Sequence, residues 1–268
     1  MGYPSDLKVV SRKLTSNIAI GSLAFSRFNV INFGARMAAI NHDDSIIIWS
    51  AMPYGPQVEE VIGLVAQKPF NISHLIIPDN QHTMAAKLFK DKYPQMKIIA
   101  PEGVDIPGLP LDYVITSDHA NKILDAAALN KIGITDPVIT ENFQFVYLPS
   151  HANKELVTYD IKLKTVFEAD LLFNLGVSEQ LEQYSRETGF SDLFNPHGGL
   201  SFLTRYMQPH SKVGNGLTRK IVHIKKAAPG LQAIYSWDFN TIVPCHGNVI
   251  DKGAKDAFKS TFAPAFTN

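Results

Sequence analysis

Residues 150–170 read SHANKELVTYDIKLKTVFEAD, and this stretch decides the fold prediction. His151 follows a run of β-forming residues, and two further runs, 156–161 and 165–169, are separated by a tight three-residue turn. The pattern predicts a β-hairpin whose second strand leads directly into Asp170. Strand ends suit metal ligands, because the sheet fixes the side chain while the loop leaves the coordination sphere open to solvent.

A second stretch near the C-terminus, IVPCHGNVI at 242–250, places His246 at the end of another short apolar strand. Taken alone, a histidine at a strand end is more often a hydrogen-bonded structural residue, and an aspartate there is commonly a cap. The order of these residues along the chain strengthens their interpretation as metal ligands. A histidine, an aspartate 19 residues later and a closing Pro-x-His-Gly segment together supply donor types that bind divalent metals.

This constellation resembles the metallo-β-lactamase superfamily. In that family a loop carries the third-motif histidine before a hairpin, the next strand ends in the metal-bridging aspartate, as in FEADLLF here, and the last histidine lies in a V-P-x-H-G segment. The resemblance assigns His151, Asp170 and His246 as metal ligands, and Asp170 and His246 as catalytic residues. It implies an α/β fold, namely a four-layer αββα sandwich of two mixed β-sheets flanked by helices.

The family's most specific motif is missing from the sequence. Where T-H-x-H-x-D-H is expected after a strand, residues 78–84 read PDNQHTM. Without gaps, Asp79 and Gln81 occupy two histidine positions and His82 falls between ligand positions. The chain is therefore similar to a motif-degenerate, poorly characterised branch of the superfamily. We expect at most one divalent metal, Zn²⁺ ahead of Fe²⁺ or Mn²⁺, with His82 or Asp79 as the fourth ligand.

The remaining sequence fits one domain over residues 1–268. Residues 7–50 predict an antiparallel meander, and a helix opening at Pro56 leads to a strand at 74–77. A helix at 84–93, a strand at 97–100, an irregular surface excursion at 101–142 with one helix at 121–131, and a strand at 143–148 follow. Residues 178–236 predict helices with glycine and proline breaks, before a strand at 241–244 and a helix at 253–262.

The charge and cysteine content indicate which class of partner and which cellular compartment to expect. Lys plus Arg (25) equal Asp plus Glu (25), so we expect a small-molecule ligand and neither nucleic acid nor membrane. The basic stretch at 219–226 is interpreted as the solvated face of a helix. The single cysteine, Cys245, excludes a disulfide within the chain and favours a cytoplasmic location. The oligomeric state stays open.

The leading functional hypothesis is a metal-dependent hydrolase of a small-molecule ester, thioester or lactone, in which a metal activates water and Asp170 orients it. The missing histidine motif supports a second hypothesis, a non-catalytic small-molecule binder or pseudoenzyme with the same fold and no metal. A single-iron redox or decarboxylating enzyme is the third.

Overall fold

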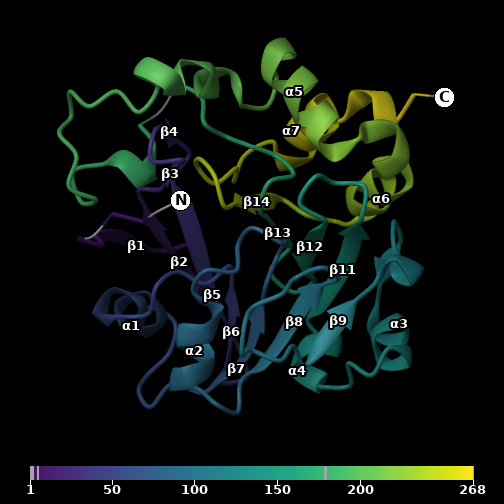
Figure 1. The fold of residues 1–268 in the computed structure, drawn as a ribbon. Coiled ribbons are helices and arrows are strands. Elements are labelled where there is room, and N and C mark those ends of the chain that lie inside the picture. Colours follow the sequence, from purple (N-terminus) through teal and green to yellow (C-terminus); the bar gives the residue numbers. More distant parts are fainter. Residues whose placement is uncertain (1–2, 5, 178–179, 268) are drawn as a thin grey trace.

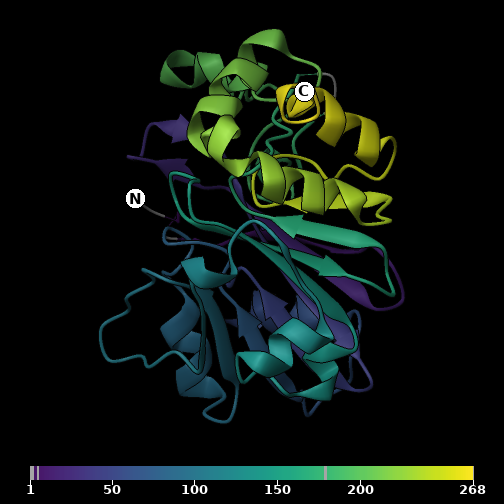
Figure 2. The same cartoon turned by 90° about the vertical axis from the view of Figure 1, so that its right-hand side faces the viewer.

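Two β-sheets packed face to face form the centre of the protein, and helices lie outside them on both sides (Figures 1 and 2). The structure is a computed structural model that describes residues 3–4, 6–177 and 180–267. One sheet has the strand order β1-β2-β5-β6-β7-β8-β9 and the other the order β10-β11-β12-β13-β14. The predicted αββα sandwich of two mixed sheets is confirmed.

The first sheet begins as an antiparallel meander and continues from β6 as parallel strands. Helices α1 and α2 make the connections from β6 to β7 and from β7 to β8, as parallel pairing requires. Pro56 opens α1, where its fixed φ suits the first helical position. The elements are β1 (Val9–Lys13), β2 (Ile18–Leu23), β5 (Ala35–His42), β6 (Ser45–Trp49), α1 (Pro56–Gly63), β7 (Ile72–Ile76), α2 (Ala86–Lys92), β8 (Lys97–Pro101) and β9 (Tyr113–Ile115).

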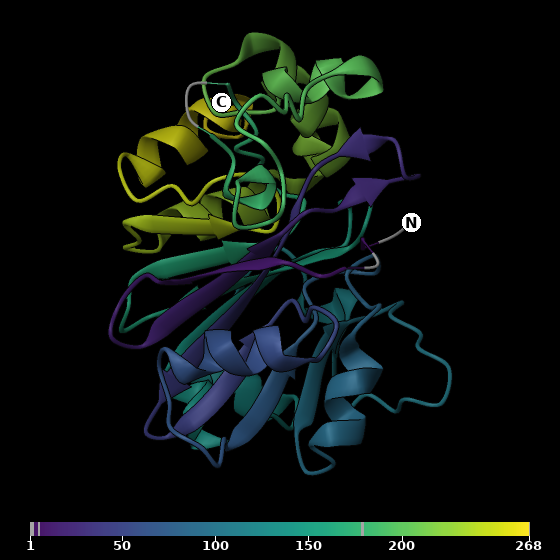
Figure 3. The ribbon, with the colours of Figure 1, turned by 90° about the vertical axis from the view of Figure 1, so that its left-hand side faces the viewer.

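The second sheet contains the hairpin predicted from residues 150–170. Strands β10 to β13 are antiparallel, and β14 adds parallel to β13. Helices α5, α6 and α7 lie on the outer side of this sheet (Figures 2 and 3). The elements are β10 (Ile123–Leu124), β11 (Phe143–Leu148), β12 (Glu155–Asp160), β13 (Thr165–Glu168), α5 (Lys212–Val222), α6 (Ile224–Ser236), β14 (Thr241–Pro244) and α7 (Ala254–Thr261).

Three apolar layers hold the sandwich together. Alternate residues of a strand point to opposite faces, so Ile47 and Trp49 of β6 pack between the sheets while Ile46 and Ile48 pack under α1 and α2. A third layer fills the space between the second sheet and α6 and α7. Both faces of each sheet are therefore buried, which explains the near-continuous apolar runs of the inner strands.

The expected surface excursion at 101–142 is wrong in one respect. This segment supplies β9 to the edge of the first sheet and β10 to the edge of the second. Helices α3 (Ala126–Lys131) and α4 (Pro137–Thr140) contribute Leu129 and Ile139 to the layer between the sheets. Strands of two or three residues carry too little periodicity to be recognised among prolines.

The helices expected over 178–236 form only in the second half of that range. Residues 178–179 lie outside the described residues, and the described part of the first half contains two 3₁₀ segments, η2 (Glu182–Tyr184) and η3 (Gly199–Tyr206), joined by irregular chain. This part is held by side-chain bonds to the backbone. For example, the Tyr184 hydroxyl donates to the Phe25 carbonyl and accepts from the Gly34 N–H.

Several loops that follow strands meet at one edge of the sandwich. Glu168 pairs with Pro244 at the ends of β13 and β14, so the loops that begin there start side by side. The N–H of Leu156 donates to the Pro78 carbonyl at 2.7 Å, which ties β12 to the loop after β7 across the two sheets. The fold thus gathers residues from distant parts of the sequence at this edge.

Candidate metal centre

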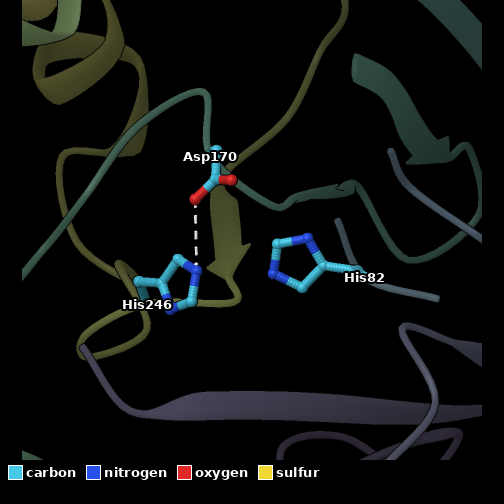
Figure 4. Close-up of side chains that lie close together, drawn as sticks. All are labelled: His82, Asp170 and His246. Carbon is cyan, nitrogen blue, oxygen red and sulfur yellow. Dashed lines mark ion pairs between the residues drawn. The ribbon is translucent and has the colours of Figure 1, made fainter. Parts of the chain in front are cut away.

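Three side chains from three different loops converge at the shared edge. His82 follows β7, Asp170 follows β13 and His246 follows β14. One ligand atom from each lies within 4.8 Å of the other two. Figure 4 shows both imidazole rings directed towards the carboxylate. Two imidazole nitrogens and one carboxylate oxygen are a donor set that divalent transition metals accept.

The ring of His246 is fixed by its backbone and aromatic neighbours. Its Nδ1 donates to the Gly34 carbonyl at 2.7 Å, and its Nε2 lies 3.1 Å from Oδ1 of Asp170. Phe173 stacks on the ring at 5.8 Å between centroids, and Phe33 packs against it at 5.6 Å. With Nδ1 bonded to a carbonyl, Nε2 is the ring nitrogen that faces the cluster and could coordinate a metal, which is the usual arrangement of a metal-binding histidine.

The ring of His82 is held in the same way by a carboxylate. Its Nδ1 lies 2.9 Å from Oδ1 of Asp79, and that oxygen also accepts the backbone N–H groups of Gln81 and His82. Nε2 is therefore the nitrogen left for a ligand. Burial by itself would lower the pKa of His82, but the Asp79 carboxylate, together with the Cys245 thiol, outweighs burial and raises that pKa well above its ordinary value.

Asp170 is buried and ionised. Burial by itself would raise its pKa, but the hydrogen bond and positive charge of His246, with the charge of His82, lower that pKa below its ordinary value. The Nδ2 of Asn153 donates to Oδ2 of Asp170. The N–H of Asp170 donates to Glu155 at 2.9 Å, so the backbone of this residue is fixed as well.

Comparison with known proteins agrees with this arrangement at the level of fold. No family model matches the sequence, and no curated protein matches it either. Among solved structures, the metallo-β-lactamase DIM-1 has a TM-score of 0.59 at 11% identity, covering 97% of this chain and 99% of that one. A metallo-β-lactamase from Erythrobacter litoralis gives 0.59 at 13% identity, with 97% and 99% coverage. A flavo di-iron protein mutant from Thermotoga maritima gives 0.61 at 14% identity, covering 97% of this chain and 62% of that one.

The chain has the metallo-β-lactamase fold. This confirms the fold implied by the sequence resemblance, which rested on the segments that carry His151, Asp170 and His246. The metallo-β-lactamase fold also accounts for the position of the candidate metal centre, because those loops lie at one edge of its sandwich.

His151 lies at this edge of the metallo-β-lactamase fold but outside the three-residue cluster. Its Nδ1 accepts the N–H of Asn153 at 3.2 Å, and its Nε2 lies 3.2 Å from the backbone carbonyl of Asp170. Both ring nitrogens are thus used within the protein, and burial lowers the pKa of His151, which favours the neutral ring. The structure therefore does not bring this predicted ligand together with the other three; it places His151 beneath Asp170 as a support for the loop.

The degenerate motif supplies one member of the cluster and one supporting residue. Sequence counting left open whether His82 or Asp79 takes part. In the structure, the turn made when Asp79 accepts the N–H groups of Gln81 and His82 carries the imidazole into the cluster, while the Asp79 carboxylate lies behind it. A D-x-x-H spacing after a strand is the only sequence signal for this pair.

Arg36 was missed by the sequence analysis and joins the first sheet to the loop of His246. Its fully buried Nη1 donates to the carbonyls of Pro244 and Gly247, both at 2.6 Å. Its Nη2 lies 3.1 Å from Glu182. Because these two carbonyls flank Cys245 and His246, the guanidinium fixes the segment that carries the histidine. Cys245 itself is buried, its thiol 3.1 Å from the Ser50 hydroxyl.

A cavity of about 270 Å³ opens beside the cluster. His82, Asp170 and His246 line it, and most of the other lining residues are apolar. Arg27 is the one lysine or arginine among its lining residues. The size and mostly apolar lining of the cavity suit a small molecule with an apolar body. The apolar lining includes Phe25, Phe33, Met84, Phe173, Met207 and Leu217.

Proposed function

We propose that the protein is a metal-dependent hydrolase with a single metal held by His82, Asp170 and His246. The observation that carries this proposal is the convergence of three ligand atoms within 4.8 Å, with both imidazoles oriented by acceptors on their other nitrogen. Supporting acceptors of this kind are typical of metal-binding histidines.

The residues present fit a divalent metal. Two nitrogens and one carboxylate oxygen match a catalytic zinc site, in which three protein ligands leave one position for water or substrate. Among the structural neighbours, one is described as a β-lactamase in a mono-zinc form and another as a flavo di-iron protein. Those descriptions support zinc first and iron as the alternative.

A metal at this position would supply a Lewis acid and a water of lowered pKa. The chain's own residues supply the rest. Asp170 accepts from Asn153 through Oδ2 and faces His246 with Oδ1, so its charge is oriented towards the cavity. The apolar wall keeps competing water away from a bound acyl group, which strengthens electrostatic interactions at the cluster.

The cavity favours an ester, thioester or lactone with an apolar acyl part. Its lining contains several aromatic and aliphatic side chains and one cation, Arg27. A neutral substrate, or one with a single negative charge near Arg27, is complementary to this lining. A polycationic or highly polar substrate does not, because burying unpaired polar groups in such a cavity is costly.

Metal analysis combined with hydrolysis assays tests the proposal. Protein purified without a tag is analysed for bound metal and assayed against p-nitrophenyl esters, acyl thioesters and lactones. We expect about one metal per chain, lost together with hydrolysis in His246→Ala and Asp170→Asn. His119→Gln, which replaces a histidine outside the cavity, is the control and should retain both. Wild-type protein without metal would favour the non-catalytic binder, and redox-active iron would favour the third hypothesis.

A further inference from the structure

The 3₁₀ segment η3 (Gly199–Tyr206) buries polar side chains and exposes apolar ones. Ser201 and Thr204 are buried, whereas Leu200 is 75% and Leu203 68% exposed. The buried hydroxyls are satisfied: Ser201 accepts the N–H of Asn32, and Thr204 donates to the Ser201 carbonyl. This pattern is the reverse of a helix that faces water.

The next helix repeats the reversal. In α5, Asn215 and Thr218 are buried, while Val213 is 66% and Leu217 46% exposed. Leu217 also lines the cavity beside the metal cluster. Two successive elements therefore present apolar side chains outward, close to the mouth of that cavity.

The hairpin β3 (Ser26–Arg27) and β4 (Ile31–Asn32) extends the same surface. It packs against η3, where the Asn32 N–H donates to the Ser201 hydroxyl. Figures 1 and 3 show the hairpin beside the segment around residue 200. Its tip exposes Phe28 and Val30, and Arg27 lines the cavity. We call the following residues the mouth surface: Arg27, Phe28, Val30, Leu200, Phe202, Leu203, Arg205, Lys212, Val213 and Leu217.

The charge of the two segments that form the mouth surface has one sign. The sequence contains no Asp or Glu from residue 7 to 42, and none from 193 to 237, although the whole chain is neutral. On the mouth surface the guanidinium of Arg205 lies over the ring of Phe202 at 5.0 Å, and that of Arg27 over Phe28 at 5.4 Å. The nearby acid Asp192 is paired with Arg186.

Apolar side chains fringed by arginine and lysine match the boundary of an anionic lipid layer, where apolar groups enter the acyl region and cations face headgroups. We propose that the mouth surface binds anionic lipid membranes peripherally, with the cavity opening towards the lipid. No helix among the described residues has the length and apolar character needed to cross a bilayer. The proposed interaction does not depend on the proposed hydrolysis.

The exposed apolar residues distinguish lipid from the other partners of a basic surface. Nucleic acid would use the cations alone, because phosphate contacts supply most of its non-specific affinity. A second copy of the chain would bring the same cations against themselves. Of the three partners, anionic lipid is the one that satisfies both the apolar side chains and the positive charge.

Vesicle co-sedimentation tests this proposal with the full chain. We expect binding to vesicles of phosphatidylcholine mixed with phosphatidylglycerol, and much weaker binding to pure phosphatidylcholine. Arg205→Gln and Lys212→Gln should each lower the affinity roughly fivefold, and Leu203→Ser about tenfold. Lys87→Gln and Leu88→Ser, which alter an exposed cation and an exposed leucine of α2, are the matched controls and should bind like wild type.

Three results would overturn the proposal. The first is no binding to the mixed vesicles at low ionic strength. The second is a dimer without lipid that Leu203→Ser converts to monomer, which would assign the mouth surface to a second copy. The third is equally tight binding to duplex DNA that Leu203→Ser leaves unchanged. Unfolding midpoints of the variants equal to that of wild type verify that the substitutions leave the fold intact.

Discussion

The carboxylate of Asp79 accepts a hydrogen bond from the ring of His82, with 2.9 Å between Oδ1 and Nδ1. Asp79 is fully buried, and the same oxygen accepts two backbone N–H groups. One side chain therefore shapes the turn and orients the ring. Counted without gaps, the sequence resemblance places Asp79 where a metal-binding histidine is expected. In the structure its carboxylate is bonded to the neighbouring ring of His82.

Asp79→Asn tests that relationship. The amide keeps the size of the side chain but loses the charge that orients His82, so we expect metal affinity to fall by roughly 10- to 100-fold. Competition with a chelator of known affinity measures the change. Asp91→Asn on the exposed side of α2 is the control and should leave the affinity unchanged. An equal loss in both variants would show that the effect is not specific to the His82 ring.

His151→Gln separates the predicted ligand set from the one the structure assembles. The ring of His151 is bonded to Asn153 and to the carbonyl of Asp170, and it lies outside the cluster of His82, Asp170 and His246. We expect this variant to retain its metal while losing about 1–3 kcal/mol of unfolding free energy through unsatisfied buried groups. His82→Gln should instead lose the metal. If His151→Gln lost the metal while its unfolding free energy stayed unchanged, His151 would be a metal ligand as the sequence resemblance implies.

The fold could be predicted because its strands and the residues that follow them have recognisable short-range sequence patterns. The hairpin at 150–170, the helix opened by Pro56 and the segment around His246 each combine a short-range pattern with a turn. The sandwich follows, since few arrangements bury both faces of such strands. β9 and β10 escaped prediction because strands this short are defined by their partners in the sheet.

The candidate site could be predicted only in part, because loop conformation decides which side chains meet. Counting residues put His82 between ligand positions, yet the turn at Asp79 carries its ring into the cluster. Counting also made His151 equivalent to a ligand, whereas the neighbouring N–H of Asn153 occupies one of its nitrogens. The exposed apolar residues of η3 reverse the usual burial pattern of a helix, so their orientation could not be predicted from periodicity.

Arg36→Met tests how the first sheet supports the loop of His246. The substitution removes the guanidinium that donates to the Pro244 and Gly247 carbonyls, although Gly247 still accepts from the Gln183 amide. It also leaves Glu182 without one of its two guanidinium partners. We expect a loss of about 3–5 kcal/mol in unfolding free energy, measured by urea denaturation, and weaker metal binding in the folded protein. Arg12→Gln, the more exposed partner of Glu182, should cost less than about 1 kcal/mol. Equal costs would contradict the role of the buried guanidinium.

His74 gives stability a pH dependence away from the metal cluster. Its Nε2 lies 3.3 Å from Asp136, yet burial outweighs that carboxylate and lowers the pKa of His74 below its ordinary value of about 6.5. The unfolded chain therefore takes up this proton first as the pH falls, and the free energy of unfolding decreases below about pH 6.5. Burial by itself would raise the pKa of Asp136, but hydrogen bonds from Lys97 and Tyr113 outweigh burial and lower it. The contribution of Asp136 to the free energy of unfolding is therefore complete above the pKa of an unfolded aspartate, about 3.9, and is lost only at more acid pH.

The variant His74→Gln removes the titrating group and keeps a donor for Asp136. We expect the slope of unfolding free energy against pH between about pH 7 and pH 5 to fall, by at most about 1.4 kcal/mol per pH unit for one proton. Urea denaturation of both proteins across this range measures the difference. Because the slope is positive when the unfolded state binds more protons, a steeper dependence in the variant would mean that the native state holds His74 protonated, contrary to its burial.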